Sequence, residues 1–245
     1  MGITLTIPGV TAPASSAANT HYQLYDDLVG ARWGGSNRPD VSNSKKGLLK
    51  GTFFGGTPTI AGDYHEFNAA SEYMNTGLIP ASTSFTLVLV AQTQSGTGAS
   101  TANVAGNTTG ATPLAAPIVG GDFQLAVVRA ANPSFRCTTF NNQTLVATLI
   151  GAQDAITTVI LSFDSVALTA HMELYASGGR VSTQTGVTAL AQAMRLREIY
   201  LGIVVGSTMR IYHSALINRA ITVAEGQGIY AKTLLPDFAK YNVAL

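Results

Sequence analysis

The sequence predicts an all-β protein, a two-sheet antiparallel jelly-roll sandwich with one short C-terminal helix and an N-terminal arm. Many apolar runs of strand length recur along the chain, and residues that favour turns separate them. The length of 245 residues fits one large β domain. We therefore expect an arm and a short helix over residues 1–30 and a single sandwich domain over residues 31–245.

The first thirty residues are rich in small side chains and begin with an alternating apolar pattern. We interpret the first twenty as an extended arm or an edge strand. Apolar residues then recur at helical spacing from Leu24 to Val29, which predicts a short helix that ends at Gly30. Residues 30–62 are rich in Gly, Ser, Asn and Pro, which indicates loops and short strands.

The middle of the chain predicts a series of strands. Residues 85–91 are apolar on both alternating faces, as expected of a central strand. Residues 92–117 consist almost entirely of small and polar residues, so we expect a long loop or a flap on a neighbouring subunit. Further strands are expected at 123–129, 134–139 and 144–150.

The clearest predicted hairpin joins an apolar run over residues 157–163 to an alternating run over residues 168–175. The even-numbered residues of the second run are expected to face the core. Two more strands are expected over 199–205 and 209–217. Thr222 and Glu225 then match a capping box, which predicts a helix that starts after Thr222.

The charge composition restricts the possible partners. Charged residues make up 11% of the chain, and Lys plus Arg exceed Asp plus Glu by one, giving a net charge of +1. Nucleic acid is therefore not an expected partner, because there is no basic excess to neutralise phosphates. A thinly charged surface resists association poorly, so we expect a homo-oligomer, with a trimer as one option.

Other classes are excluded by what the sequence does not contain. Cys137 is the single cysteine, so we expect neither an intramolecular disulfide nor a cysteine-based metal site, and Cys137 is interpreted as a small buried hydrophobe. The first twenty residues do not have the pattern of a secretory signal. No apolar run approaches the length of a membrane-spanning helix, so membrane insertion is not expected.

Three motifs in the right order resemble the concanavalin A-like, laminin-G-like jelly rolls. They are Phe67-Asn-Ala-Ala-Ser-Glu-Tyr73-Met74 with Ser84-Phe85-Thr86-Leu87; Val159-Ile-Leu-Ser-Phe163-Asp164 with Met172-Glu-Leu-Tyr175-Ala-Ser-Gly178-Gly-Arg-Val181; and the run from Met209 through Asn218-Arg219-Ala220 to Glu225. The resemblance covers roughly residues 60–235. The chain departs from the family by lacking a Trp-His pair before the hairpin and an Asp-rich calcium loop.

The resemblance implies one of several functions, since this family includes lectins, glycan-recognition modules, glycoside hydrolases and bacteriophage virion proteins. The low charge, the small-residue arm and the absence of a signal pattern favour the last of these. We therefore expect a protein of the virion, assembled in the host cytoplasm, whose partners are copies of itself, other virion proteins and host surface polysaccharide.

Two loop segments are best equipped to bind a glycan, because they combine aromatic rings with polar groups. One contains Arg32, Trp33 and Arg38, and the other is Asp63-Tyr64-His65. Trp33 has a second interpretation as an anchor of the core or of a subunit interface, where Trp and Arg are also enriched.

Catalysis is not expected. A glycosidase needs two positioned carboxylates. The Glu-x-Asp-x-Glu strand of sandwich glucanases is missing, and the most closely spaced carboxylates that could share a strand face are Asp63 and Glu66. Motifs of serine hydrolases and nucleotide-binding loops are also missing, and the four histidines are too far apart to suggest a metal site, so we expect no cofactor and no metal.

The sequence thus predicts a non-enzymatic, oligomeric structural protein of a bacteriophage particle with a role in host attachment or glycan binding. The alternatives are a lectin-like module outside a virion and, third, a glycoside hydrolase. Aromatic residues lining an open concave face would favour the lectin, and a convergent carboxylate pair in a groove would favour the enzyme.

Overall fold

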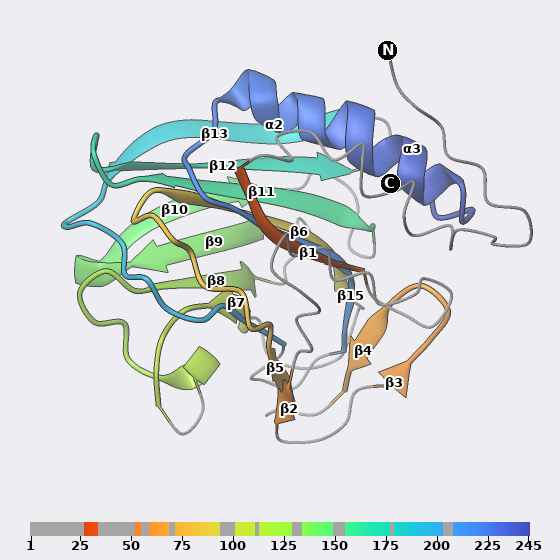
Figure 1. Ribbon diagram of the computed structural model, residues 1–245, viewed down its shortest axis with the longest axis horizontal. Coiled ribbons are helices and arrows are strands. Elements are labelled where there is room, and N and C mark those ends of the chain that lie inside the picture. The colour runs from red at the N-terminus through yellow and green to blue at the C-terminus, as the bar shows by residue number, and fades with distance from the viewer. Residues whose placement is uncertain are drawn as a thin grey trace, which may run out of the picture.

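The protein folds as a sandwich of two antiparallel sheets, as predicted (Figure 1). The computed structural model describes residues 27–33, 52–54, 59–68, 72–93, 101–110, 113–128, 134–148, 155–176, 179–202 and 208–245. One sheet has eight strands in the order β13-β12-β11-β6-β15-β4-β3, with β1 also paired to β15. The other has seven, in the order β10-β9-β8-β7-β14-β5-β2.

The strands of the eight-stranded sheet come from both ends of the chain. Their bounds are β1 Leu28–Trp33, β3 Thr59–Ile60, β4 His65–Phe67, β6 Phe85–Thr93, β11 Thr157–Asp164, β12 Thr169–Ala176, β13 Gly179–Ala189 and β15 Met209–Ile217. Those of the seven-stranded sheet are β2 Thr52–Phe54, β5 Tyr73–Asn75, β7 Thr101–Gly106, β8 Phe123–Val128, β9 Ser134–Thr139, β10 Gln143–Thr148 and β14 Tyr200–Gly202. Short 3-10 turns lie at η2 Pro113–Ala115 and η3 Phe140–Asn142.

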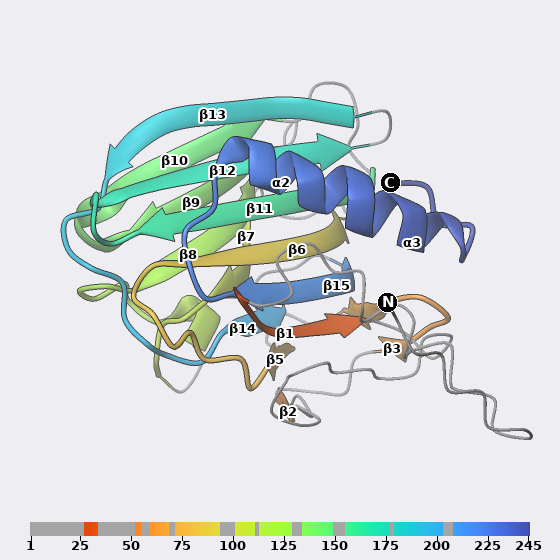
Figure 2. The ribbon, with the colours of Figure 1, turned by 45° about the horizontal axis from the view of Figure 1, so that its top comes forward.

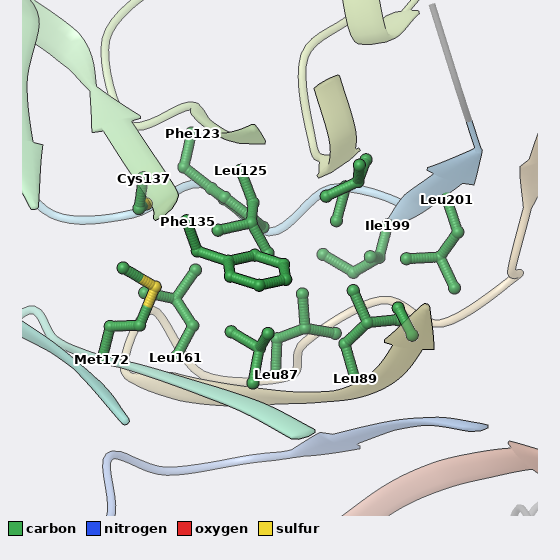
Figure 3. Packing of buried hydrophobic residues seen from close by; sticks show 14 of the residues in the cluster. Leu87, Leu89, Phe123, Leu125, Phe135, Cys137, Leu161, Met172, Ile199 and Leu201 are labelled. Carbon is green, nitrogen blue, oxygen red and sulfur yellow. The ribbon is translucent and has the colours of Figure 1, made fainter. Parts of the chain in front are cut away.

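The main hydrophobic core lies between the two sheets (Figure 3). Leu87 and Leu89 of β6 point into it from one sheet, and Leu125 of β8 and Leu201 of β14 point into it from the other. These positions alternate with residues that face outward, because successive side chains of a strand point to opposite faces. Cys137 is 1% exposed within this core, which confirms its interpretation as a buried hydrophobe.

A C-terminal helical segment covers the outer face of the eight-stranded sheet (Figure 2). It consists of α2 Val223–Ile229, a π-helical turn η4 Tyr230–Leu234 and α3 Leu235–Ala239. Ile229, Leu234 and Phe238 pack with outward-facing residues of β6, β11, β12 and β15 in a second apolar cluster. This second layer explains why β6 is apolar on both faces.

The start of the helix confirms the predicted capping box. The Thr222 hydroxyl accepts a hydrogen bond from the Glu225 backbone N–H, and the Glu225 carboxylate accepts one from the Thr222 backbone N–H at 2.8 Å. Arg219 binds the same carboxylate at 2.6 Å and the Asp27 carboxylate at 2.7 Å. The cap therefore also ties the helix start to the residue that precedes β1.

Most of the predicted strands are confirmed, including the hairpin of β11 and β12. Ala170, Met172 and Leu174 face the inter-sheet core as expected. Leu168 does not, because it lies in the turn at a positive φ of 52° and its side chain is 40% exposed. The opposite face of β12 is not open to solvent, since the helical segment buries Glu173 and Tyr175 there.

Two predicted elements are wrong. The helix predicted over residues 24–29 does not end at Gly30, because the chain from Leu28 onward is strand β1, in which Leu28 packs under the C-terminal segment and Val29 against the inter-sheet core. Residues 24–26 of that prediction lie outside the described residues. The long loop expected over residues 92–117 contains strand β7. Its Val104 and Ala105 are fully buried, and small side chains suffice there because neighbouring strands supply the rest of the core.

None of the helices in the described part of the chain is long and apolar enough to cross a membrane.

Candidate functional site

The structure brings the two predicted glycan-binding segments to one place beside β15. The backbone of β1 ends with Arg32 opposite Ser214 and Trp33 opposite His213, and β4 begins with His65 opposite Ile211. The two strands therefore follow one another along the same edge of β15. Arg38 lies outside the described residues, and for Arg32 and Trp33 the structure describes the backbone.

Tyr64 belongs to a packed network that we call the hairpin cluster: Asp63, Tyr64, Glu66, Gln92, Arg210 and Tyr212. The Arg210 guanidinium lies 4.5 Å from the centre of the Tyr64 ring, and the Tyr212 ring centre is 5.3 Å from it. Arg210 Nε also donates to Glu66 Oε2 at 2.6 Å. The Arg210 cation–π contact and the Tyr212 ring therefore already engage the Tyr64 ring, and the ion pair with Glu66 holds the guanidinium in place.

The remaining polar groups of the hairpin cluster reinforce this arrangement. The Tyr212 hydroxyl donates to Gln92 Oε1 at 3.0 Å. Burial raises the pKa of Tyr212 to about 12 although the Arg210 charge opposes the shift, so the hydroxyl stays protonated at neutral pH. Burial alone would lower the pKa of Arg210, but its bond to Glu66 raises it. The cluster is thus a largely self-satisfied network on the outer face of the sheet.

Asp63 and His65, the neighbours of Tyr64 in the predicted segment, lie in different surroundings. Asp63 Oδ1 is buried and has no hydrogen-bond partner among the described residues. An acceptor in that state gains from a water or a ligand hydroxyl. His65 is 9% exposed at the start of β4, so it lies within the sheet rather than in the predicted loop.

A second group of polar and aromatic residues lies on the outer face of the seven-stranded sheet. We call Tyr73, Asn75, Glu198 and Tyr200 the tyrosine site. Asn75 lies directly opposite Tyr200 across the β5–β14 pair, and the Tyr73 and Tyr200 rings meet edge to face with centres 6.1 Å apart. Their neighbours Met74 and Leu201 point into the inter-sheet core, so the tyrosines point outward.

Glu198 organises the polar side of the tyrosine site. Its Oε2 accepts hydrogen bonds from Asn75 Nδ2 at 2.6 Å and from the Tyr200 hydroxyl at 3.0 Å. Burial, followed by the hydrogen bond and the charge of Glu198, raises the pKa of Tyr200 to about 12. The hydroxyl therefore remains a donor at neutral pH, and Glu198 Oε1 is left as an acceptor with no bond to another described residue.

The tyrosine site is accessible in the described part of the structure. Asn75, Glu198 and Tyr200 are partly exposed. Among the described residues, the turn η2 packs against β7, where the Asn103 amide donates to the Leu114 carbonyl at 2.6 Å, and it also contacts β14, the strand of Tyr200. The long helical segment covers the other sheet, so the two outer faces of the sandwich differ.

None of the four residues of the tyrosine site is among the site residues predicted from the sequence. The signal that could have found it is the alternation Glu198-Ile199-Tyr200-Leu201, in which the polar and aromatic residues share one face while Ile199 and Leu201 are core. The partner Asn75 is 123 positions away from Glu198. No local pattern indicates that these two strands are neighbours.

A third polar group is enclosed. Glu173 is fully buried under α2, and it accepts hydrogen bonds from the Tyr175 hydroxyl and from the His171 ring at 3.2 Å. Gly226 of α2 packs directly on its carboxylate. Because the helix seals this group, it is not accessible to a ligand in this structure.

The described residues contain no cluster of three or more His, Cys, Asp or Glu side chains that could hold a metal ion. The groups that the two sites do present are aromatic rings, amides and charged side chains. At the tyrosine site these groups are a partly exposed ring, an amide and a carboxylate.

No family model matches the chain, and no curated protein matches it in sequence. Solved structures do match. The receptor-binding domain of botulinum neurotoxin D superposes with a TM-score of 0.59 at 10% identity, over 86% of this chain and 54% of that one. The binding domain of Paraclostridial Mosquitocidal Protein 1 superposes with a TM-score of 0.59 at 12% identity, over 85% of this chain and 52% of that one.

A Trypanosoma rangeli sialidase in complex with sialic acid gives a TM-score of 0.56 at 15% identity, over 86% of this chain and 33% of that one. The chain thus spans about half the length of the toxin domains and a third of the sialidase. Likeness at this level of identity concerns the fold. The sandwich described above is the concanavalin A-like jelly roll that the sequence motifs resemble.

Proposed function

We propose that this protein is a non-enzymatic carbohydrate-binding module that binds a neutral sugar at the tyrosine site. The observation that carries the proposal is a partly exposed Tyr200 ring beside a carboxylate with an unused oxygen, on an outer sheet face. Sugars bind proteins through stacking of their apolar faces on aromatic rings and through hydrogen bonds from their hydroxyls.

Each group at the site has a defined role in this proposal. The Tyr200 ring stacks on the sugar, and Tyr73 supports that ring from the side. Glu198 Oε1 accepts from sugar hydroxyls, while its other oxygen is held by Asn75 and Tyr200. The carboxylate is therefore positioned before the ligand arrives, which lowers the entropic cost of binding.

The charge of the site selects the class of sugar. Glu198 has no ion-pair partner among the described residues. An acidic sugar such as sialic acid would bring a second carboxylate close to it, and like charges at short range disfavour binding. We therefore propose neutral sugars as ligands, although sialic acid is bound by the sialidase to which this fold is similar.

The non-enzymatic part of the proposal follows from the number of carboxylates in place. A glycosidase uses one carboxyl group as acid and a second as base or nucleophile. Glu198 is the single carboxylate of the tyrosine site. The hairpin cluster has two carboxylates, Asp63 and Glu66, but Arg210 holds Glu66 at 2.6 Å, which leaves Glu66 poorly placed to act as a proton donor.

As the setting of this activity we propose a bacteriophage particle, in which the protein forms a homo-oligomer, contacts other virion proteins and binds host surface polysaccharide. The support is the charged fraction of 11% and the small-residue segment that precedes the sandwich. Repetition of weak sugar contacts around a symmetric assembly would then give firm attachment.

The test is titration of the purified protein with neutral and sialylated oligosaccharides, with binding and product release recorded together. We expect binding of neutral sugars without cleavage. Tyr200→Ala should weaken it at least tenfold, and Tyr200→Phe, which keeps the ring, should weaken it less.

Tyr64→Ala and Trp33→Ala are matched aromatic controls at the hairpin cluster and beside it, and should leave the affinity unchanged. Loss of binding in these variants but not in Tyr200→Ala would move the site to the sequence-predicted segments. Equal binding of sialylated sugars would refute the neutral class. Absence of any binding would refute the proposed function.

A further inference from the structure

One end of the sandwich is held together by a single segment, residues 190–199, which we call the strap. Its backbone N–H groups donate to Leu168 in the β11–β12 turn at 2.8 Å, to Gly121 before β8 at 2.9 Å and to Leu78 after β5 at 3.0 Å. The loops that it joins lie on the left in Figures 1 and 2. This end is therefore one connected surface rather than a set of independent loops.

Exposed apolar side chains concentrate on this surface. Six large hydrophobic residues are exposed in the described part of the chain, and five of them lie on the strap or on the loops that it joins. We call these five the loop rim: Ile79, Val119, Val166, Leu168 and Leu196. Val166, at the turn between β11 and β12, is 92% exposed. Clustering of this kind marks an interaction surface, whereas scattered exposed residues do not.

The charged groups around the loop rim are Asp122, Asp164, Arg195 and Arg197, and both carboxylates are bound within the protein. Asp122 is paired with Arg197 at 3.1 Å. Asp164 Oδ1 accepts hydrogen bonds from the backbone N–H groups of Val166 and Ala167 at 2.9 and 3.0 Å. A partner for this surface must therefore be apolar and carry little charge.

The N-terminal segment, residues 1–26, lies outside the described residues, and its composition fits that requirement. Residues 1–26 contain no Lys or Arg and one acidic residue, Asp26, and Ile3, Leu5 and Ile7 alternate near their start. An alternating apolar segment can lie as an extended strand with one side against an apolar surface.

This segment also joins the sandwich at the same end as the loop rim. The Asp27 carbonyl accepts from the Asn218 backbone N–H at 2.8 Å, and Asn218 Oδ1 accepts from the Ala81 N–H at 2.8 Å, two residues from Ile79. From that point 26 extended residues reach up to about 85 Å. A domain of this length has a radius of gyration of about 18 Å, so the segment can extend onto a neighbouring molecule.

We propose that the loop rim is the surface on which a second copy of this chain docks, with the apolar residues of positions 3–7 of that copy lying on it. The inference rests on the proposed homo-oligomer and assigns its interface. A lipid surface fits less well, because the loop rim is aliphatic and contains none of the Trp, Tyr or Lys residues that anchor loops at membranes.

The test is analytical ultracentrifugation of the full chain over a wide range of concentration. The double variant Val166→Glu/Leu196→Glu places two charges on the loop rim, and it should raise the dissociation constant at least 100-fold. Both side chains are largely exposed, so the fold should tolerate the change, which circular dichroism checks. Ile60→Glu is the matched control, because Ile60 is 51% exposed on β3, away from the loop rim, and should associate as the wild type does.

A deletion of residues 2–20 should weaken association as much as the double variant does. Unchanged association in the double variant would overturn the interface while leaving the proposed oligomer standing. Unchanged association of the deleted chain would overturn the role of positions 3–7. A wild-type chain that stays monomeric at all concentrations would overturn both the interface and the oligomer, and the sugar titration would still test the binding function separately.

Discussion

The contact between Gly226 and the buried Glu173 carboxylate leads to a prediction that opposes helix propensity. In an exposed helix interior, Gly→Ala stabilises by about 0.5–1 kcal/mol because alanine restricts the unfolded chain and favours the helix. At Gly226, however, a Cβ atom would lie 2.6 Å from Glu173 Oε1 and 2.8 Å from Oε2, where ordinary contacts begin at 3.4 Å.

The carboxylate cannot readily move away. Tyr175 and His171 hold its two oxygens, and the side chain is fully buried. Overlap this close places the cost in the upper part of the usual overpacking range, about 2–3 kcal/mol. After a propensity gain of about 0.5–1 kcal/mol is subtracted, Gly226→Ala should destabilise by about 1–2 kcal/mol. For a chain of this size the melting temperature should fall by about 3–6 °C.

Chemical and thermal denaturation of matched variants measure this effect. Gly228→Ala in the same helix is the control and should be neutral or slightly stabilising. Glu173→Ala is itself destabilising but removes the obstacle, so the double variant should show a favourable coupling of about 1–2 kcal/mol. Glu173→Gln keeps the volume and should show no such coupling. A Gly226→Ala variant as stable as the wild type would refute the packing argument.

Three further predictions concern titratable groups. The hydrogen bond from Arg219 lowers the pKa of Glu225 to about 2 from its ordinary 4.5. A carboxyl group whose pKa is lower in the folded state stabilises the fold at pH values above its unfolded pKa, and this contribution is lost as the pH falls toward the folded pKa. The free energy of unfolding should therefore lose about 1 kcal/mol, discounted for partial exposure, between pH 4.5 and pH 2. Urea titrations should show this loss in the wild type but not in Glu225→Gln. Burial raises the pKa of Asp122 against the pull of Arg197. Arg197→Ala leaves this buried carboxylate unpaired, so it should lower the free energy of unfolding by about 3 kcal/mol at pH 7. A raised carboxyl pKa favours the folded state as the pH falls, so the difference in stability between wild type and variant should shrink on acidification. A difference that does not change with pH would contradict this. Burial also raises the pKa of Cys137, so its thiol should react with a disulfide reagent only after unfolding, and fast labelling of the native chain would contradict this.

The strands that the sequence predicts correctly are those whose pattern reports burial directly. β9 matches its predicted range because its buried and exposed residues alternate between the two faces of a sheet. β15 also matches its range, as a largely apolar run that is buried on both faces. β7 was missed because its small residues become core only after β8 and β14 pack beside it. The start of β1 was misread because the two layers bury both of its faces, which places adjacent apolar residues Leu28 and Val29 in a pattern that also fits a helix.

The candidate site was less predictable than the fold. The sequence indicated Tyr64 as a loop aromatic, but Arg210, which lies over its ring, comes from a strand 144 positions beyond Glu66. Composition cannot reveal that this ring is engaged. The capping residues Thr222 and Glu225 were predictable because their chemistry operates within one turn of helix.

The edge of the eight-stranded sheet beside β15 is built from two pieces of chain. β1 occupies the half opposite residues 213–217 and β4 the half opposite residues 209–211. Each piece has its own hydrogen bonds to β15, so the register of one does not depend on the other. The chain between Trp33 and His65 also supplies β2 to the other sheet and β3 and Tyr64 to this one. Between Trp33 and β2, however, a change of length would shift neither ladder on β15, which makes residues 34–51 a natural point for inserting a peptide or a whole domain.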